Sequence, residues 1–227
     1  MTHLVSNHMS FQKLSAFGEP QISSAATIAH GWRKLPSTLP ELTDFLHGGL
    51  PFASVIEWGL PWGHEVREVV LSLLAMTTSH RWDQPLWSLW VHTRERICVY
   101  PPAWEARGID LSFIRFAYSR KPLDDLRAIF LDPFFKVIIL DLSHGSSLKP
   151  EEMAFLARTA RQQNQMIIIL RDYLLSPQKG NVWAKLRLNC WRVDHQKLQL
   201  RIVKGLPPAN LSLSMSLIGR KKPNHHC

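Results

Sequence analysis

The sequence predicts an α/β fold in which a mostly parallel sheet is flanked by helices and extended by an antiparallel C-terminal hairpin. Strand-like apolar runs alternate with helix-like segments of roughly 10–15 residues, which is typical of βαβ units. Two runs, 136–141 and 166–170, are almost continuously apolar, as expected for strands that are covered on both faces. From residue 185 the rhythm changes, because two runs of alternating apolar and basic residues flank a short turn. These runs predict the hairpin.

The expected elements follow one another in chain order. A proline near its start and Gly-Gly after its end predict a short helix over 40–47. A strand at 52–58 precedes a helix over 65–80, in which Val and Leu recur at helical spacing. The other expected elements are strands at 85–92, 113–118, 136–141 and 166–170, short helices at 102–107 and 123–131, a helix at 150–163, and hairpin strands at 185–193 and 197–204.

Composition bounds the organisation of the chain. Its 227 residues, 45% of them hydrophobic, suit one large domain with appendages. We expect a flexible N-terminal arm (1–31), a core domain (32–205) and an irregular basic C-terminal tail (206–227). Because no stretch of about 18 apolar residues occurs, we expect no membrane span. Three cysteines without metal-type spacing, and a start that lacks a secretory pattern, favour a cytoplasmic protein without a metal site.

The net charge of +9 is concentrated near the C-terminus. Residues 1–170 hold 16 basic and 16 acidic residues, whereas residues 171–227 hold 11 basic and 2 acidic ones. This asymmetry predicts a polyanion or an acidic protein as partner. The candidate contact groups on the hairpin are Lys185, Arg187, Arg192, Lys197, Arg201 and Lys204, with Arg220, Lys221 and Lys222 in the tail. Alternation should place the hairpin's basic groups on one face and its leucines on the other.

A degenerate phosphate loop follows the strand at 52–58. A working P-loop has the form GxxxxGK[ST], in which backbone N–H groups and Lys bind the phosphates and Ser or Thr holds magnesium. Here Gly59 and Gly63 are one residue too close, His64 replaces Lys and Glu65 replaces the hydroxyl residue. Pro61 also removes one N–H donor. We therefore predict no ATP binding, no catalytic residues and no cofactor.

Asp141 ends the apolar run at 136–141, where a P-loop enzyme has the carboxylate that assists magnesium. An Asp at the end of a strand is also common as a cap. Since the loop that it would serve is degenerate, we interpret Asp141 as structural.

Several segments resemble the RecA/RadA/KaiC superfamily. Residues 36–51 read PSTLPELTDFLHGGLP, which is similar to that superfamily's STGxPELDxLLGGGLP motif, and the strand at 55–59 follows at the matching distance. Residues 104–110 resemble the turn before the third strand of RecA, and residues 197–204 resemble a late strand of the same fold. The similarity spans roughly residues 33–205. It implies a RecA-like core for the α/β sheet.

Within that superfamily the chain looks most like the ImuA family, RecA-like and SulA-like proteins of mutagenesis cassettes. The degenerate loop and the proline-aromatic segment 100–104 support this resemblance. It implies a non-catalytic adaptor in SOS-induced mutagenic translesion DNA synthesis. The implied partners are an ImuB-like Y-family polymerase homologue, RecA and a subunit of an error-prone replicative polymerase. A RecA-type ATPase with an unusual loop and a SulA-like inhibitor of cell division are the alternatives.

Tryptophans leave two further questions open. Trp58 and Trp62 bracket the degenerate loop and either fill the nucleotide's space or form a stacking or partner surface. Trp183 and Trp191 lie among basic residues, so the hairpin is either a weak binder of single-stranded DNA or amphipathic with Trp inside. The segment 176–181 lies roughly where RecA carries a DNA-binding loop.

Overall fold

The computed structural model describes residues 34–61, 63, 66–79, 82–93, 100–142 and 147–218. The expected N-terminal arm, 1–31, lies outside the described residues, as do the basic tail residues Arg220, Lys221 and Lys222. The strands are β1 (Lys34–Leu35), β2 (Leu50–Pro51), β3 (Ser54–Gly59), β4 (Ser88–His92), β5 (Ile114–Tyr118), β6 (Val137–Asp141), β7 (Met166–Arg171), β8 (Leu186–Asp194), β9 (Lys197–Lys204) and β10 (Asn210–Ser214). The helices are α2 (Pro40–Phe45), α3 (Arg67–Leu74), α4 (Pro101–Glu105), α5 (Pro122–Asp125), α6 (Arg127–Leu131), α7 (Pro150–Gln162) and α8 (Met215–Ile218), with a 3₁₀ turn at Leu111–Phe113.

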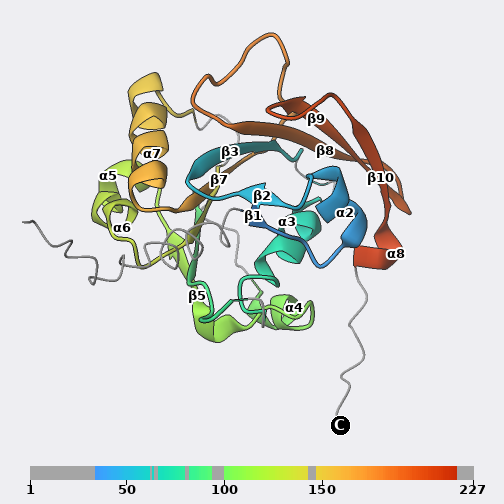
Figure 1. Ribbon diagram of the computed structural model, residues 1–227, viewed down its shortest axis with the longest axis horizontal. Helices are drawn as coiled ribbons and strands as arrows, with labels where there is room; N and C mark the ends of the chain where they lie inside the picture. Colours follow the sequence, from blue (N-terminus) through green and yellow to red (C-terminus); the bar gives the residue numbers. More distant parts are fainter. Residues whose placement is uncertain are drawn as a thin grey trace, which may run out of the picture. The chain divides into compact units, whose positions relative to one another are not determined.

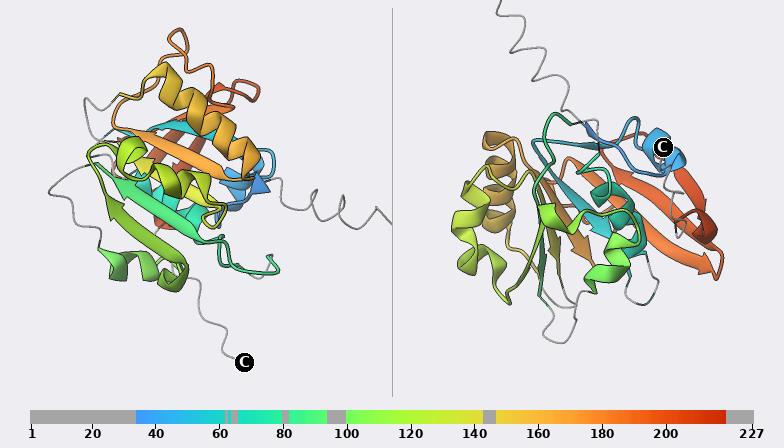
Figure 2. Two further views of the ribbon diagram at one scale, coloured as in Figure 1. Left: turned by 90° about the vertical axis from the view of Figure 1, so that its left-hand side faces the viewer. Right: turned by 90° about the horizontal axis from the view of Figure 1, so that it is seen from below.

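Eight strands form one sheet in the order β10-β9-β8-β3-β7-β6-β4-β5. The six strands from β8 to β5 are parallel, and β9 and β10 continue the sheet in antiparallel fashion. Helices α5, α6 and α7 lie on one side of the sheet, and α3 and α4 lie on the other (Figures 1 and 2). The predicted fold class is confirmed: a RecA-like, mostly parallel sheet with an antiparallel C-terminal extension. None of the described helices combines the length and the apolar character needed to cross a membrane.

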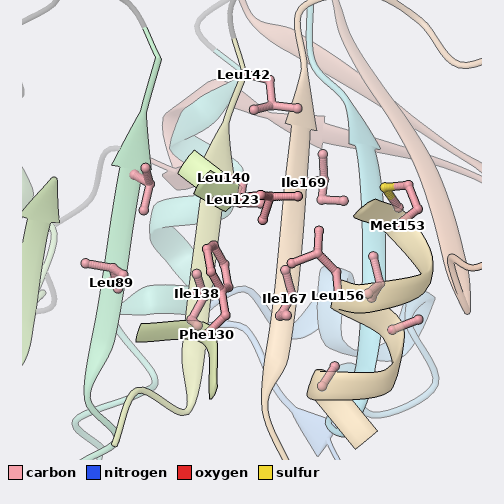
Figure 3. Close-up of a cluster of buried hydrophobic side chains, with 14 residues drawn as sticks. Leu89, Leu123, Phe130, Ile138, Leu140, Leu142, Met153, Leu156, Ile167 and Ile169 are labelled. Carbon is pink, nitrogen blue, oxygen red and sulfur yellow. The ribbon is translucent and has the colours of Figure 1, made fainter. Parts of the chain in front are cut away.

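The main core lies between the sheet and the helices α5 to α7. Figure 3 shows Ile138, Leu140, Ile167 and Ile169 pointing from β6 and β7 toward α7. These four side chains are fully buried. Strand alternation places Val55 and Glu57 of β3 on this same face, while Ile56 and Trp58 point to the α3 side. A charged residue therefore follows the core residue Val55 on the same face.

Three expectations about the elements were wrong. The helix expected over 123–131 is two short helices, because the backbone at Leu126 leaves helical geometry (φ −113°, ψ 18°). The helix expected over 65–80 covers Arg67–Leu74 only, and the Thr77 hydroxyl donates to the Leu74 carbonyl just after its end. The chain after residue 205 was expected to be irregular, yet β10 pairs with β9 along five residues.

The hairpin is not the edge of the sheet. β8 pairs with β3 on one side and β9 on the other, and β10 covers the outer side of β9. The predicted antiparallel hairpin is present as β8 and β9, and the following segment adds one more strand outside it.

Candidate functional site

The end of β3 is packed tightly by protein atoms. A Cβ at Gly59 would lie 2.6 Å from the Tyr173 carbonyl oxygen, and it would also overlap Asn189 Oδ1. The next residue, Leu60, is buried and donates its N–H to the Arg171 carbonyl at 2.7 Å. Gly59 is thus required by the close approach of Asn189 and the chain after β7, with no phosphate needed to explain it.

The rest of the degenerate loop is described only in part. Gly63 has a φ of +82°, in the left-handed region that favours glycine, and none of the described residues crowds its Cβ position. Trp62, His64 and Glu65 lie outside the described residues. α3 then begins at Arg67, after a Val66 that makes no side-chain cap.

Arg67, the first residue of α3, and Asp141, the last residue of β6, form an ion pair with two hydrogen bonds. Arg67 Nε donates to Asp141 Oδ2 at 2.9 Å, and its Nη2 donates to Oδ1 at 2.6 Å. Both side chains are mostly buried, with 20% and 11% of their surfaces exposed. Such parallel bonds are among the stronger charge-assisted contacts in proteins. Both oxygens of the carboxylate at the expected magnesium position therefore accept from a guanidinium.

A RecA-like fold implies a magnesium–nucleotide complex at this end of β3, and the described residues do not fit it. The carboxylate that would assist the metal is bound to Arg67. The N–H of Leu60, the first after the strand, is bonded to Arg171 of β7, and protein atoms crowd the Cβ position of Gly59.

A buried cluster of three charges lies on the other face of β3. Glu57 Oε1 accepts from Arg171 Nε at 3.0 Å, and Glu57 Oε2 accepts from Arg187 Nε at 2.9 Å. The three residues stand on adjacent strands, β7, β3 and β8, and each side chain is at most 6% exposed. Buried charges need such partners, because removing them from water is costly.

The sequence patterns considered above did not predict this cluster, although one residue in the sequence points to it. Glu57 is the one charged residue in the apolar run 52–58, and a charge inside a buried strand requires a partner of opposite sign.

The same cluster holds a loop across the sheet. We call residues 172–185, between β7 and β8, the crossing loop; it includes the orange arc in Figure 1. Arg187 donates to the carbonyls of Ser176 (3.0 Å) and Lys179 (3.2 Å). Asn189 accepts from the N–H of Leu175 at 2.7 Å and donates to its carbonyl at 2.9 Å. At the far end, Lys204 Nζ donates to the carbonyls of Asn181, Val182 and Ala184 at 2.9–3.2 Å.

Only some of the basic residues proposed for the hairpin face are therefore exposed to solvent. The expectation is wrong for Arg187, which is buried and paired with Glu57 because the crossing loop lies over this part of β8. Lys204 is half-buried and bonded to the crossing loop. Arg192 is half-buried and donates to the carbonyls of Asp194 and His195. The remaining candidates, Lys185, Lys197 and Arg201, are exposed.

The described tryptophans of the two candidate sites also differ in their exposure to solvent. Trp58 is fully buried, so it belongs to the core and not to a stacking or partner surface. Trp191 is half-buried, whereas Trp183 is exposed at the end of the crossing loop.

Comparison with protein-family models and with curated proteins finds no match for this chain.

Proposed function

We propose that this protein is a non-catalytic, RecA-like adaptor in SOS-induced mutagenic translesion DNA synthesis, and that it works in the cytoplasm. It binds an ImuB-like pseudo-polymerase and RecA through protein contacts, and through them an error-prone replicative polymerase. The resemblance of residues 36–51 and 100–104 to the ImuA family supports this proposal, together with the order of strands in the sheet.

The observation that supports the non-catalytic part most directly is the ion pair between Arg67 and Asp141. A carboxylate bound at both oxygens by a guanidinium would have to lose that partner before it could assist a metal ion. Breaking the pair would take the Asp141 carboxylate away from a mostly buried arginine, which is costly. The free energy of binding magnesium and a nucleotide at this end of β3 would therefore have to offset the cost of breaking this ion pair.

Nucleotide binding separates the adaptor from a RecA-type ATPase. We expect the tryptophan fluorescence of the full chain to stay flat when magnesium-ATP is added to millimolar concentration. The Arg67→Ala variant frees Asp141 but leaves the packing at Gly59, so we expect it to stay flat as well. Saturation at micromolar ATP that is abolished by Gly63→Asp would instead identify an ATPase-type site.

Partner binding tests the adaptor itself. Purified full-length chain should bind the ImuB-like pseudo-polymerase and RecA with micromolar or tighter affinity, measured by surface-plasmon titration. A cell-division GTPase serves as the comparison, because it is the partner expected of a SulA-like inhibitor. Binding to the GTPase alone would replace the proposal with that alternative.

A further inference from the structure

The backbone at the end of the crossing loop is hydrogen-bonded to residues of β3, β8 and β9. We call residues Lys179–Lys185 the displayed segment. Arg187 fixes its first carbonyl, Lys204 fixes three further carbonyls, and the Lys185 N–H donates to Val55 of β3 at 2.9 Å. The Trp183 N–H also donates to Asn181 Oδ1 at 3.0 Å. Six of its seven residues thus have a backbone group bonded within the protein.

This held backbone presents apolar side chains to solvent. Val182 is 76% exposed and Trp183 is 41% exposed, the former being the most exposed large hydrophobic side chain among the described residues. Both flanking lysines, Lys179 and Lys185, are exposed, and the segment contains no acidic residue. Exposed apolar groups on a fixed backbone lose little conformational freedom when a partner binds.

We propose that the displayed segment is a docking site for a protein segment that carries an apolar anchor and flanking carboxylates. The anchor packs against Val182 and Trp183, and the carboxylates pair with Lys179 and Lys185. Tryptophan is enriched among the residues that dominate binding energy, and complementary charge around it speeds association and fixes orientation. This inference rests on the proposed function, since it assigns the surface through which the adaptor binds its partner.

A protein fits this surface better than single-stranded DNA does. DNA-binding platforms combine aromatic rings, on which bases stack, with a basic groove that follows the phosphates. Here the more exposed of the two apolar residues is the aliphatic Val182, which offers no stacking face. Arg187 and Lys204, which would line such a groove, point inward and donate to the carbonyls of the loop.

The test compares two double variants of the full chain by surface-plasmon titration against the ImuB-like pseudo-polymerase and RecA. Val182→Ser/Trp183→Ser removes the anchor contacts. Tyr118→Ser/Leu131→Ser removes one aromatic and one aliphatic side chain, 46% and 48% exposed, elsewhere on the described surface. We expect the first variant to weaken binding of at least one partner about thirty-fold, as for a hot-spot residue. The second should change it less than about three-fold.

A charge variant provides a second readout that does not depend on the apolar changes. Lys179→Glu/Lys185→Glu alters only exposed side chains, so it should keep the unfolding curve of the parent chain. We expect it to weaken the same partner at low salt, with a difference that shrinks as salt screens the charges.

The outcomes are distinguishable. If the parent chain binds neither partner, the proposed function fails and the docking site fails with it. If the parent chain binds and both variants of the displayed segment bind equally well, only the docking site is wrong. If these variants lose affinity for a thymidine oligonucleotide but keep both protein contacts, the segment is a nucleic-acid platform and the inference is overturned.

Discussion

β8 and β9 are neighbouring strands of one hairpin, and their sequences look alike. Each alternates leucine or isoleucine with polar and basic residues. In β9 the alternation separates the faces, because Leu198 and Leu200 are buried while Lys197 and Arg201 are exposed. In β8 the first five residues are buried without alternation, including Arg187 and Asn189. The same pattern therefore gives an amphipathic strand in β9 and a strand buried on both faces in the first part of β8.

The crossing loop causes the difference, because β8 and β9 both lie between two other strands. β8 lies between β3 and β9, and the crossing loop lies over its polar face, bonded to Arg187 and Asn189. Burial also raises the pKa of the Cys190 thiol on this strand, so the thiol stays protonated at neutral pH. On β9, Lys197 and Arg201 are instead exposed, and Lys204 at the end of the strand bonds to the crossing loop. Arg187 and Asn189 in the first part of β8 thus hold the loop, whereas Lys197 and Arg201 of β9 are exposed to solvent.

The strongest way to break this comparison is to remove the charge that allows β8 to hold a buried arginine. Glu57→Gln removes the carboxylate that pairs with both buried arginines, Arg171 and Arg187, so we expect a loss of about 4 kcal/mol in the free energy of unfolding. Urea denaturation followed by tryptophan fluorescence measures the loss. A loss below about 1 kcal/mol would mean that the two arginines reach water or another counter-charge.

Matched arginine substitutions on the two strands should differ widely. Arg187→Met removes one ion pair and the donor to two loop carbonyls, and we expect a loss of about 3 kcal/mol, since Arg171 still pairs with Glu57. Arg201→Met, on the exposed face of β9, should change stability by about 0.5 kcal/mol or less. Equal losses in urea denaturation would show that β8 and β9 do not differ as described.

Limited trypsin digestion gives a local readout of the same pair. Without its bond from Arg187, the Lys179 region should open more often, so cleavage after Lys179 should accelerate in Arg187→Met and not in Arg201→Met. Unchanged cleavage in both variants would show that Arg187 does not hold the crossing loop.

The smallest expected contrast concerns neutral polar residues. Asn189→Ala leaves the buried N–H and C=O of Leu175 without partners, and we expect a loss of about 2 kcal/mol. Gln199→Ala on β9 removes only an exposed bond from Ser212, and its effect should be about 0.5 kcal/mol or less. If Asn189→Ala proves as mild as Gln199→Ala, water replaces the lost bonds and the loop is less tightly packed than the structure shows.

The sequence by itself determined the class of fold and the order of most elements. Continuous apolar runs at 136–141 and 166–170 predicted interior parallel strands, because a strand covered on both faces needs no polar side. The departures at residues 59–65 likewise follow from residue identity alone. Those features are local, so neighbouring residues suffice to recognise them.

The tertiary structure alone decided which charges meet. Arg67 and Asp141 are 74 residues apart, and Glu57 and Arg187 are 130 apart, so no local pattern could pair them. β10 was missed because its pairing depends on β9 already being in place. The burial of Arg187 follows from a loop that folds over β8 and from Glu57 on the next strand. An ion pair's partner is set by distance in space, and only the assembled sheet brings these residues within bonding distance.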